Sequence, residues 1–106
     1  MNIDEKEALT QRTVVSSEAI ARRLKAARMV AEPTQKEFAA HVGLSPTTYN
    51  SQETKGSPSM KVMEYLYKNH RIDFNFVLYG DFLTLPGDVQ TALFAALHAI
   101  DTGQGT

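Results

Sequence analysis

The junction Gly43-Leu44-Ser45-Pro46 constrains the fold of this chain more than any other part of its sequence. Glycine readily takes the left-handed conformation that ends a helix, serine caps the start of the next helix, and proline is favoured at the first helical position. The preceding segment opens with a capping-box pattern at Thr34 and Glu37. The sequence therefore predicts two short helices joined by a tight turn, over about residues 34–42 and 46–54.

Helical periodicity extends to both sides of this pair, and no segment shows the strict alternation of a strand. We expect a helix that is capped at Ser16 or Ser17 and ends before Pro33, and further helices that begin at Ser59, Asp73 and Asp88. The chain of 106 residues has room for one domain. The sequence predicts an all-α chain with a flexible arm over 1–16, partly helical or not, a helical domain over 17–82, and a helix and tail over 83–106.

Composition excludes several classes of protein. The chain has no cysteine, which removes disulfide scaffolds, thiol nucleophiles and zinc–cysteine sites. No apolar run approaches the length of about 20 residues that a membrane span needs, and the polar N-terminus does not resemble a signal peptide. His41, His70 and His98 are widely spaced and form no metal-binding motif, and no set of catalytic groups converges. We expect no enzyme activity, metal, cofactor, small-molecule ligand or membrane association.

The formal net charge of -1 hides an uneven distribution. Residues 20–71 hold nine basic and four acidic side chains, a net +5, and the remainder of the chain carries -6. Arg22, Arg23, Lys25 and Arg28 lie off the apolar face of the first expected helix. A locally basic surface favours contact with phosphate, although scattered, solvated charges are an alternative of equal weight.

The chain resembles the Cro and phage-repressor-like (XRE-type) helix-turn-helix family over about residues 20–81. Four pieces carry the resemblance, in order and spacing: RRLKAAR (Arg22–Arg28), TQKEFAAHVGLSPTTYNSQE (Thr34–Glu53), GSPSMKVMEYL (Gly56–Leu66) and FNFVLYGD (Phe74–Asp81). The resemblance implies a five-helix repressor-like DNA-binding domain that contains a helix-turn-helix, followed here by one extra C-terminal helix. The second helix of such a motif can enter the major groove of DNA.

The resemblance also implies roles for individual residues. The base-facing positions are Pro46, Thr47, Asn50 and Ser51. The positions implied to contact phosphate are Gln35, Ser45, Lys55, Lys61, Arg22 and Arg28. For each of these residues an ordinary solvated surface role is the alternative, and Tyr49 is expected in the core rather than stacked on a base.

This sequence departs from the family pattern at the expected recognition helix. It has no arginine or lysine before Lys55, so the strongest base-reading pair, arginine with guanine, is missing there. Pro46 occupies a position that the family often gives to a reading side chain, and Gln52 stands where an apolar residue is usual. Readout of DNA shape is then expected to supply part of any specificity.

The last expected helix has an apolar face that must be buried. Its members are Val89, Leu93, Phe94, Leu97 and Ile100. Two alternatives are open: the helix folds back on its own domain, or it pairs with its copy in a homodimer that would bind a palindromic operator. In the second alternative, Leu97→Glu yields monomers.

The sequence thus predicts a DNA-binding transcriptional regulator of cytoplasmic, nucleoid-associated location. We expect it to be a homodimeric repressor, of bacterial or phage type, whose partner is double-stranded DNA. The alternative is a protein-interaction module, antitoxin-like, that docks a partner through its last helix and binds DNA weakly or without specificity. A steep dependence of DNA affinity on salt would distinguish the two, because each neutralised phosphate releases counterions.

Overall fold

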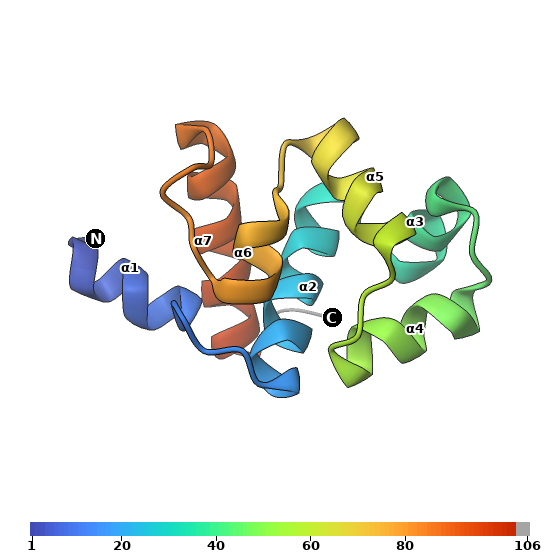
Figure 1. Cartoon of the computed structure of the whole chain (residues 1–106), viewed down its shortest axis with the longest axis horizontal. Coiled ribbons are helices and arrows are strands. Elements are labelled where there is room, and N and C mark those ends of the chain that lie inside the picture. Colours follow the sequence, from blue (N-terminus) through green and yellow to red (C-terminus); the bar gives the residue numbers. More distant parts are fainter. Residues whose placement is uncertain (104–106) are drawn as a thin grey trace.

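Helix α2 (Ser17–Ala31) lies at the centre of the molecule (Figure 1). The computed structural model describes residues 1–103, which form seven α-helices and no strand. Helix α2 packs against α7 (Gly87–Asp101), α4 (Pro46–Lys55) and α6 (Phe74–Tyr79), and more lightly against α3 (Gln35–Val42) and α5 (Met60–His70). The domain measures 39 × 27 × 23 Å along its principal axes. The predicted all-α class is confirmed over the described residues.

The helix boundaries follow the local capping residues. Ser16, Thr34, Ser45, Ser59 and Asp73 each accept a hydrogen bond from the backbone N–H three residues further on. Gly43, Gly56 and Gly80 end α3, α4 and α6 in the left-handed conformation. These caps satisfy backbone groups that helix ends leave without partners. The starts and ends that the sequence predicts for these helices are therefore confirmed to within a residue or two.

The N-terminal segment, whose helicity the sequence leaves open, is partly helical. Helix α1 (Ile3–Thr10) forms there, with a complete capping box between Asn2 and Glu5. Leu9 and Thr10 are buried, and α1 packs against α7. The order comes from contacts with a helix almost 80 residues away in the sequence, which local periodicity does not reveal. The pair Asn2 and Glu5 at cap spacing is the local signal that predicts this helix.

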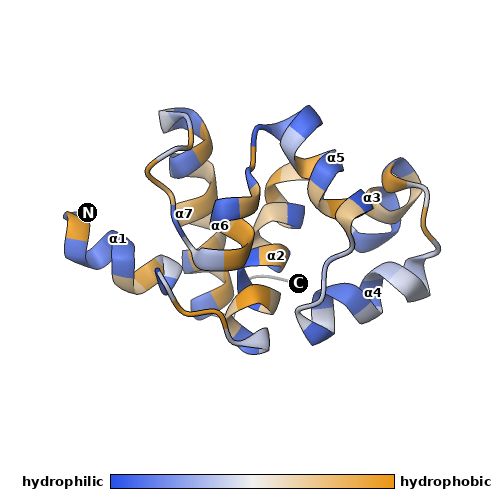
Figure 2. Ribbon diagram, in the orientation of Figure 1, coloured by the Kyte–Doolittle hydropathy of each residue, from blue (hydrophilic) through white to orange (hydrophobic). Residues whose placement is uncertain are grey.

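Helix α7 folds back on its own domain. Val89, Leu93, Phe94 and Leu97 are buried, and Ile100 is half-buried against the same core. Figure 2 shows hydrophobic colouring along much of α7, whereas α4 is mostly blue and white. The prediction that these five side chains form a dimer interface is wrong, because α2 and α1 of the same chain already occupy that face. No helix among the described residues is both long and apolar enough to cross a membrane.

Arg23 is fully buried, contrary to its expected place on an outer face of α2. Its guanidinium donates hydrogen bonds to the carbonyl oxygens of five residues: Thr10, Gln11, Val14, Val77 and Leu78. These carbonyls lie at or just beyond the C-terminal ends of α1 and α6, where a cation is favoured. Burial, with Arg22 adding to it, lowers the pKa of Arg23 to about 10. The residue thus joins α1, α2 and α6 while remaining charged at neutral pH.

Candidate nucleic-acid interface

A three-residue turn joins α3 to α4. Gly43 has a φ of 86°, and its N–H and that of Leu44 both donate to the carbonyl of Ala39, each at 2.9 Å. Ser45 then caps α4 by accepting from the N–H of Thr48 at 3.1 Å. These bonds reverse the chain sharply and leave the start of α4 at the surface, where Ser45 and Pro46 are exposed.

Helix α4 has one exposed polar face and one buried face. Pro46, Thr47 and Asn50 are exposed, and Ser51 is half-buried beside them. Thr54, four residues after Asn50, extends this face by one turn; it is not among the residues predicted from the sequence, although its spacing from Asn50 is a signal for it. We call these five residues the α4 face. The structure therefore brings the four predicted base-facing residues together on one side of one helix.

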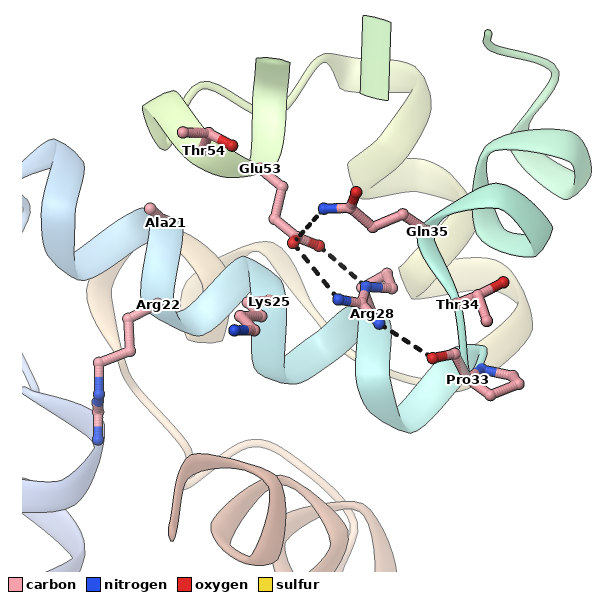
Figure 3. A pocket seen from close by; sticks show the side chains of 9 residues that line it. All are labelled: Ala21, Arg22, Lys25, Arg28, Pro33, Thr34, Gln35, Glu53 and Thr54. Atoms are coloured by element: carbon pink, nitrogen blue, oxygen red, sulfur yellow. Dashed lines mark hydrogen bonds and ion pairs between the residues drawn. The ribbon is translucent and has the colours of Figure 1, made fainter. Parts of the chain in front are cut away.

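The opposite side of α4 is fixed by a buried polar network around Glu53 (Figure 3). The Glu53 carboxylate accepts hydrogen bonds from Arg28 Nε at 3.0 Å, Gln35 Nε2 at 2.6 Å and the Tyr49 hydroxyl at 2.8 Å. Arg28 also donates to the carbonyl of Pro33 at 3.3 Å. The network therefore ties α4 to α2, to α3 and to the loop between them.

Tyr49 links this network to the apolar core, as the sequence predicts. Its ring lies 4.7 Å from the ring of Phe38, centroid to centroid, and is fully buried. Burial, together with the neighbouring Glu53 carboxylate, raises the pKa of the Tyr49 hydroxyl well above its usual range. The hydroxyl therefore stays protonated and acts as a donor to Glu53 at all physiological pH values.

An open groove of about 560 Å³ lies between α2, the start of α3 and the end of α4. Its wall includes Lys25 from α2, Thr34 at the start of α3 and Thr54 at the end of α4 (Figure 3). The Arg28–Glu53 ion pair and Gln35 also line it. Arg22 and Lys25 complete the cationic part of the wall, and Arg22 is paired with Asp101 outside it. Lys25 is a groove residue that the sequence analysis did not select, although it lies one turn before Arg28.

The positions expected to contact phosphate fall into two groups. Ser45, Lys55 and Lys61 are exposed around α4 and the turn, and the Lys61 ammonium donates to the Gly43 carbonyl at 3.4 Å. Gln35 is half-buried, and its side-chain amide points to Glu53 at the edge of the groove. Ser45, Lys55 and Lys61 are thus accessible from solvent, whereas the Gln35 amide is engaged by Glu53.

Arg28 and Arg22 require a correction. Only 2% of the Arg28 side chain is exposed, because it forms the buried ion pair with Glu53. Arg22 pairs with Asp101 on α7, with Nη2 and Oδ2 2.8 Å apart, and donates to the carbonyl of Leu9. Both guanidiniums thus hold helices of the same chain together, and neither is placed as a surface contact for phosphate. Local charge counts do not reveal such pairing, since the partners lie 25 and 79 residues away.

Over residues 1–103, no group of three or more histidine or acidic side chains is arranged to hold a metal ion. Comparison with known proteins finds no relative: no family model, no curated protein and no solved structure matches this chain. Any function of this surface must therefore be inferred from the residues described above.

Proposed function

We propose that this chain is a sequence-specific DNA-binding regulator in which α3 and α4 act as a helix-turn-helix and α4 enters the major groove. In this proposal α2 to α6 form the five-helix repressor-like domain, and α1 and α7 extend it. The observation that carries the proposal is the exposed polar face of a short capped helix whose back is fixed by the Glu53 network. A reading helix needs this rigidity, because base contacts depend on the positions of a few side chains.

The side chains of the α4 face suit base edges. The Asn50 side-chain amide can donate to N7 of adenine and accept from its N6 amino group, and the Thr47 methyl suits the methyl group of thymine. Each good bidentate contact contributes about 1–3 kcal/mol of discrimination between bases. Pro46 and Ser51 discriminate less between bases, so sequence-dependent DNA shape supplies the remaining specificity in this proposal.

Phosphate contacts come from the exposed residues around α4. Ser45, Lys55 and Lys61 flank the face, and the groove that Lys25 and Thr54 line lies along one side of it. Such contacts position a protein on the duplex without reading its sequence. Regulation then acts by occlusion of a promoter, with no chemical step.

The first experiment selects bound duplexes from a random DNA pool at about 100 mM salt, where non-specific attraction is reduced. An enriched motif supports the proposal, and a two-fold symmetric motif adds that two copies bind together. A dimer would use a surface other than the buried α7 face. A pool without any enriched motif contradicts sequence-specific binding.

Matched variants then locate the interface. Asn50→Ala removes an exposed amide from the α4 face and is expected to weaken binding to the selected site by about 1–3 kcal/mol, roughly 5- to 150-fold. Asn75→Ala removes an exposed amide from α6 and is expected to leave binding unchanged. Equal effects of the two substitutions would contradict the assignment of α4 as the reading helix.

A second candidate is a protein-interaction module, and one observation favours it. Tyr67, Tyr79 and Leu83 on the α5–α6 side each expose more than half of their surface. A small apolar hollow of about 320 Å³ lies beside Tyr67 and Phe74. Docking through the final helix is no longer part of this candidate, because the apolar face of α7 is buried. Failure of the DNA selection would make this candidate the preferred one.

A further inference from the structure

Three titratable side chains meet where α2, α3 and α5 end. Glu32 is the residue that caps the C-terminus of α2, His41 lies in the last turn of α3, and His70 is the last residue of α5. Nδ1 of His41 lies 2.5 Å from Oε1 of Glu32. The His41 side chain is 56% exposed, whereas Glu32 is 15% exposed. Glu32 thus pairs with a solvated histidine, and both residues act electrostatically on His70.

His70 has an unusual environment for a polar ring. Its Nε2 is buried and has no hydrogen-bond partner among the described residues, and its ring centroid lies 5.4 Å from that of Tyr65. Burial lowers the pKa of His70, the Glu32 carboxylate acts in the opposite direction, and His41 lowers it further. His70 is thus neutral at pH 7 and packs as an aromatic side chain.

A row of aromatic rings connects His70 to the back of α4. The Tyr65 ring meets the edge of the Phe38 ring at 5.4 Å, and Phe38 contacts Tyr49 at 4.7 Å. Tyr49 in turn donates to Glu53 in the buried network. A change in the position of the His70 ring would therefore reach α3 and α4 through side chains that are in direct contact.

We propose that His70, next to the Glu32–His41 pair, is a proton-responsive packing group: its ring stays against Tyr65 at neutral pH and leaves that position at mildly acidic pH. A protonated His70 carries a charge on a ring whose Nε2 has no acceptor, so the ring must turn toward Glu32 or toward solvent. Either movement withdraws it from Tyr65.

The charged groups around His70 fix the direction of this response. Glu32 faces it from α2, His41 from α3, and Tyr65 from its own helix. The adjacent Arg71 is paired with Asp88, with Nη2 and Oδ2 2.6 Å apart. Because the folded pKa of His70 is lowered, its contribution to stability is fully present above the unfolded value of 6.5 and is lost as the pH falls through the lower folded value.

The test compares urea denaturation midpoints at about pH 7.5 and about pH 5.5 for three proteins. One proton taken up on unfolding raises the unfolding equilibrium constant by at most about tenfold per pH unit. The natural chain is expected to lose stability at the lower pH. His70→Phe keeps a ring against Tyr65 and is expected to lose less, and His98→Gln, an exposed histidine on α7, is expected to behave like the natural chain. If His70→Phe keeps the full pH dependence, the proposal is overturned.

A second measurement needs no substitution. Titration of the histidine ring protons by NMR is expected to place the pKa of His70 below its ordinary value of 6.5, with backbone amides of α3 and α4 shifting in step with His70. A His70 pKa at or above the ordinary value, or α3 and α4 amides that do not respond, overturns the proposal. Neither experiment involves DNA, so their outcome is separate from that of the proposed function. One consequence does rest on the proposed function: binding to the selected DNA site is expected to weaken as the pH falls from about 7.5 to about 5.5.

Discussion

At the scale of single residues, Glu53 determines how α4 is held. Its carboxylate receives donors from α2, α3 and α4 at once, and Arg28 is its buried counter-charge. A buried ion pair contributes little net stability compared with apolar packing, but removal of one partner leaves the other charge buried and uncompensated. The Arg28–Glu53 pair therefore fixes the position of α4, and a substitution that removes one partner is expected to destabilise the fold strongly.

The corresponding prediction concerns Glu53→Gln and Tyr49→Phe. Glu53→Gln leaves the Arg28 charge without its carboxylate and is expected to lower the free energy of unfolding by about 3–5 kcal/mol. Tyr49→Phe removes one hydrogen bond and keeps the ring against Phe38, so a loss of about 1–2 kcal/mol is expected. Urea denaturation of both variants measures the difference. A Tyr49→Phe loss as large as that of Glu53→Gln would contradict the assigned importance of the buried charge.

At the scale of helices and turns, the two glycines that flank α4 have different tasks. A Cβ at Gly43 would meet only the end of the flexible Lys61 side chain, at 3.1 Å. A Cβ at Gly56 would lie 2.0 Å from the Ser17 carbonyl oxygen and 2.8 Å from its carbon. Both residues have positive φ, but only Gly56 lets the end of α4 approach the start of α2. The turn at Gly43, which is the more evident of the two in the sequence, therefore tolerates an added side chain better than the turn at Gly56.

This difference gives a prediction for the two alanine substitutions. Gly43→Ala carries mainly the cost of a left-handed backbone, about 1–2 kcal/mol. Gly56→Ala adds a backbone clash that only movement of α4 or α2 can relieve, so its loss is expected to exceed that of Gly43→Ala by about 1–3 kcal/mol. Denaturation midpoints of the two variants, measured side by side, check the order. The reverse order would contradict the close packing of α4 on α2.

At the scale of the whole molecule, the prediction for Leu97 changes with the structure. Leu97 is fully buried within its own chain, so Leu97→Glu is expected to unfold the protein rather than separate two folded copies. Leu97→Ala is expected to cost about 2–5 kcal/mol. Ala95→Glu, at an exposed position of the same helix, is expected to keep the fold. A folded Leu97→Glu protein, shown by circular dichroism and a cooperative thermal transition, would contradict this packing.

What the sequence predicts well is local. The caps at Ser16, Thr34, Ser45, Ser59 and Asp73 and the exposed face of α4 depend on residues within a few positions, and local rules predict them. The partners of Arg22, Arg23 and Arg28 lie from 5 to 79 residues away, and no local pattern identifies them. Three arginines that resemble a basic surface in the sequence are instead the internal connections of the fold. The packing of α1 and α7 is likewise not predicted by local patterns, because contacts with distant helices hold each of them in place.

Arg23 brings these long-range connections together, and its replacement is the most demanding test of the assembled domain. Arg23→Met keeps much of the side-chain volume but leaves five carbonyl oxygens without their donor. Because a buried polar group that loses its partner costs about 1–3 kcal/mol, a total loss above about 3 kcal/mol is expected. Arg23→Lys has three donors for five carbonyls, so its loss of stability should fall between that of Arg23→Met and that of the natural chain.

The loss of stability should appear first as faster hydrogen exchange in α1, which Arg23 and the packing on α7 hold in place. Arg71→Met removes an exposed ion pair and is expected to change little. If Arg23→Met and Arg71→Met unfold at the same denaturant concentration, then hydrophobic packing alone holds α1 and α6 on α2.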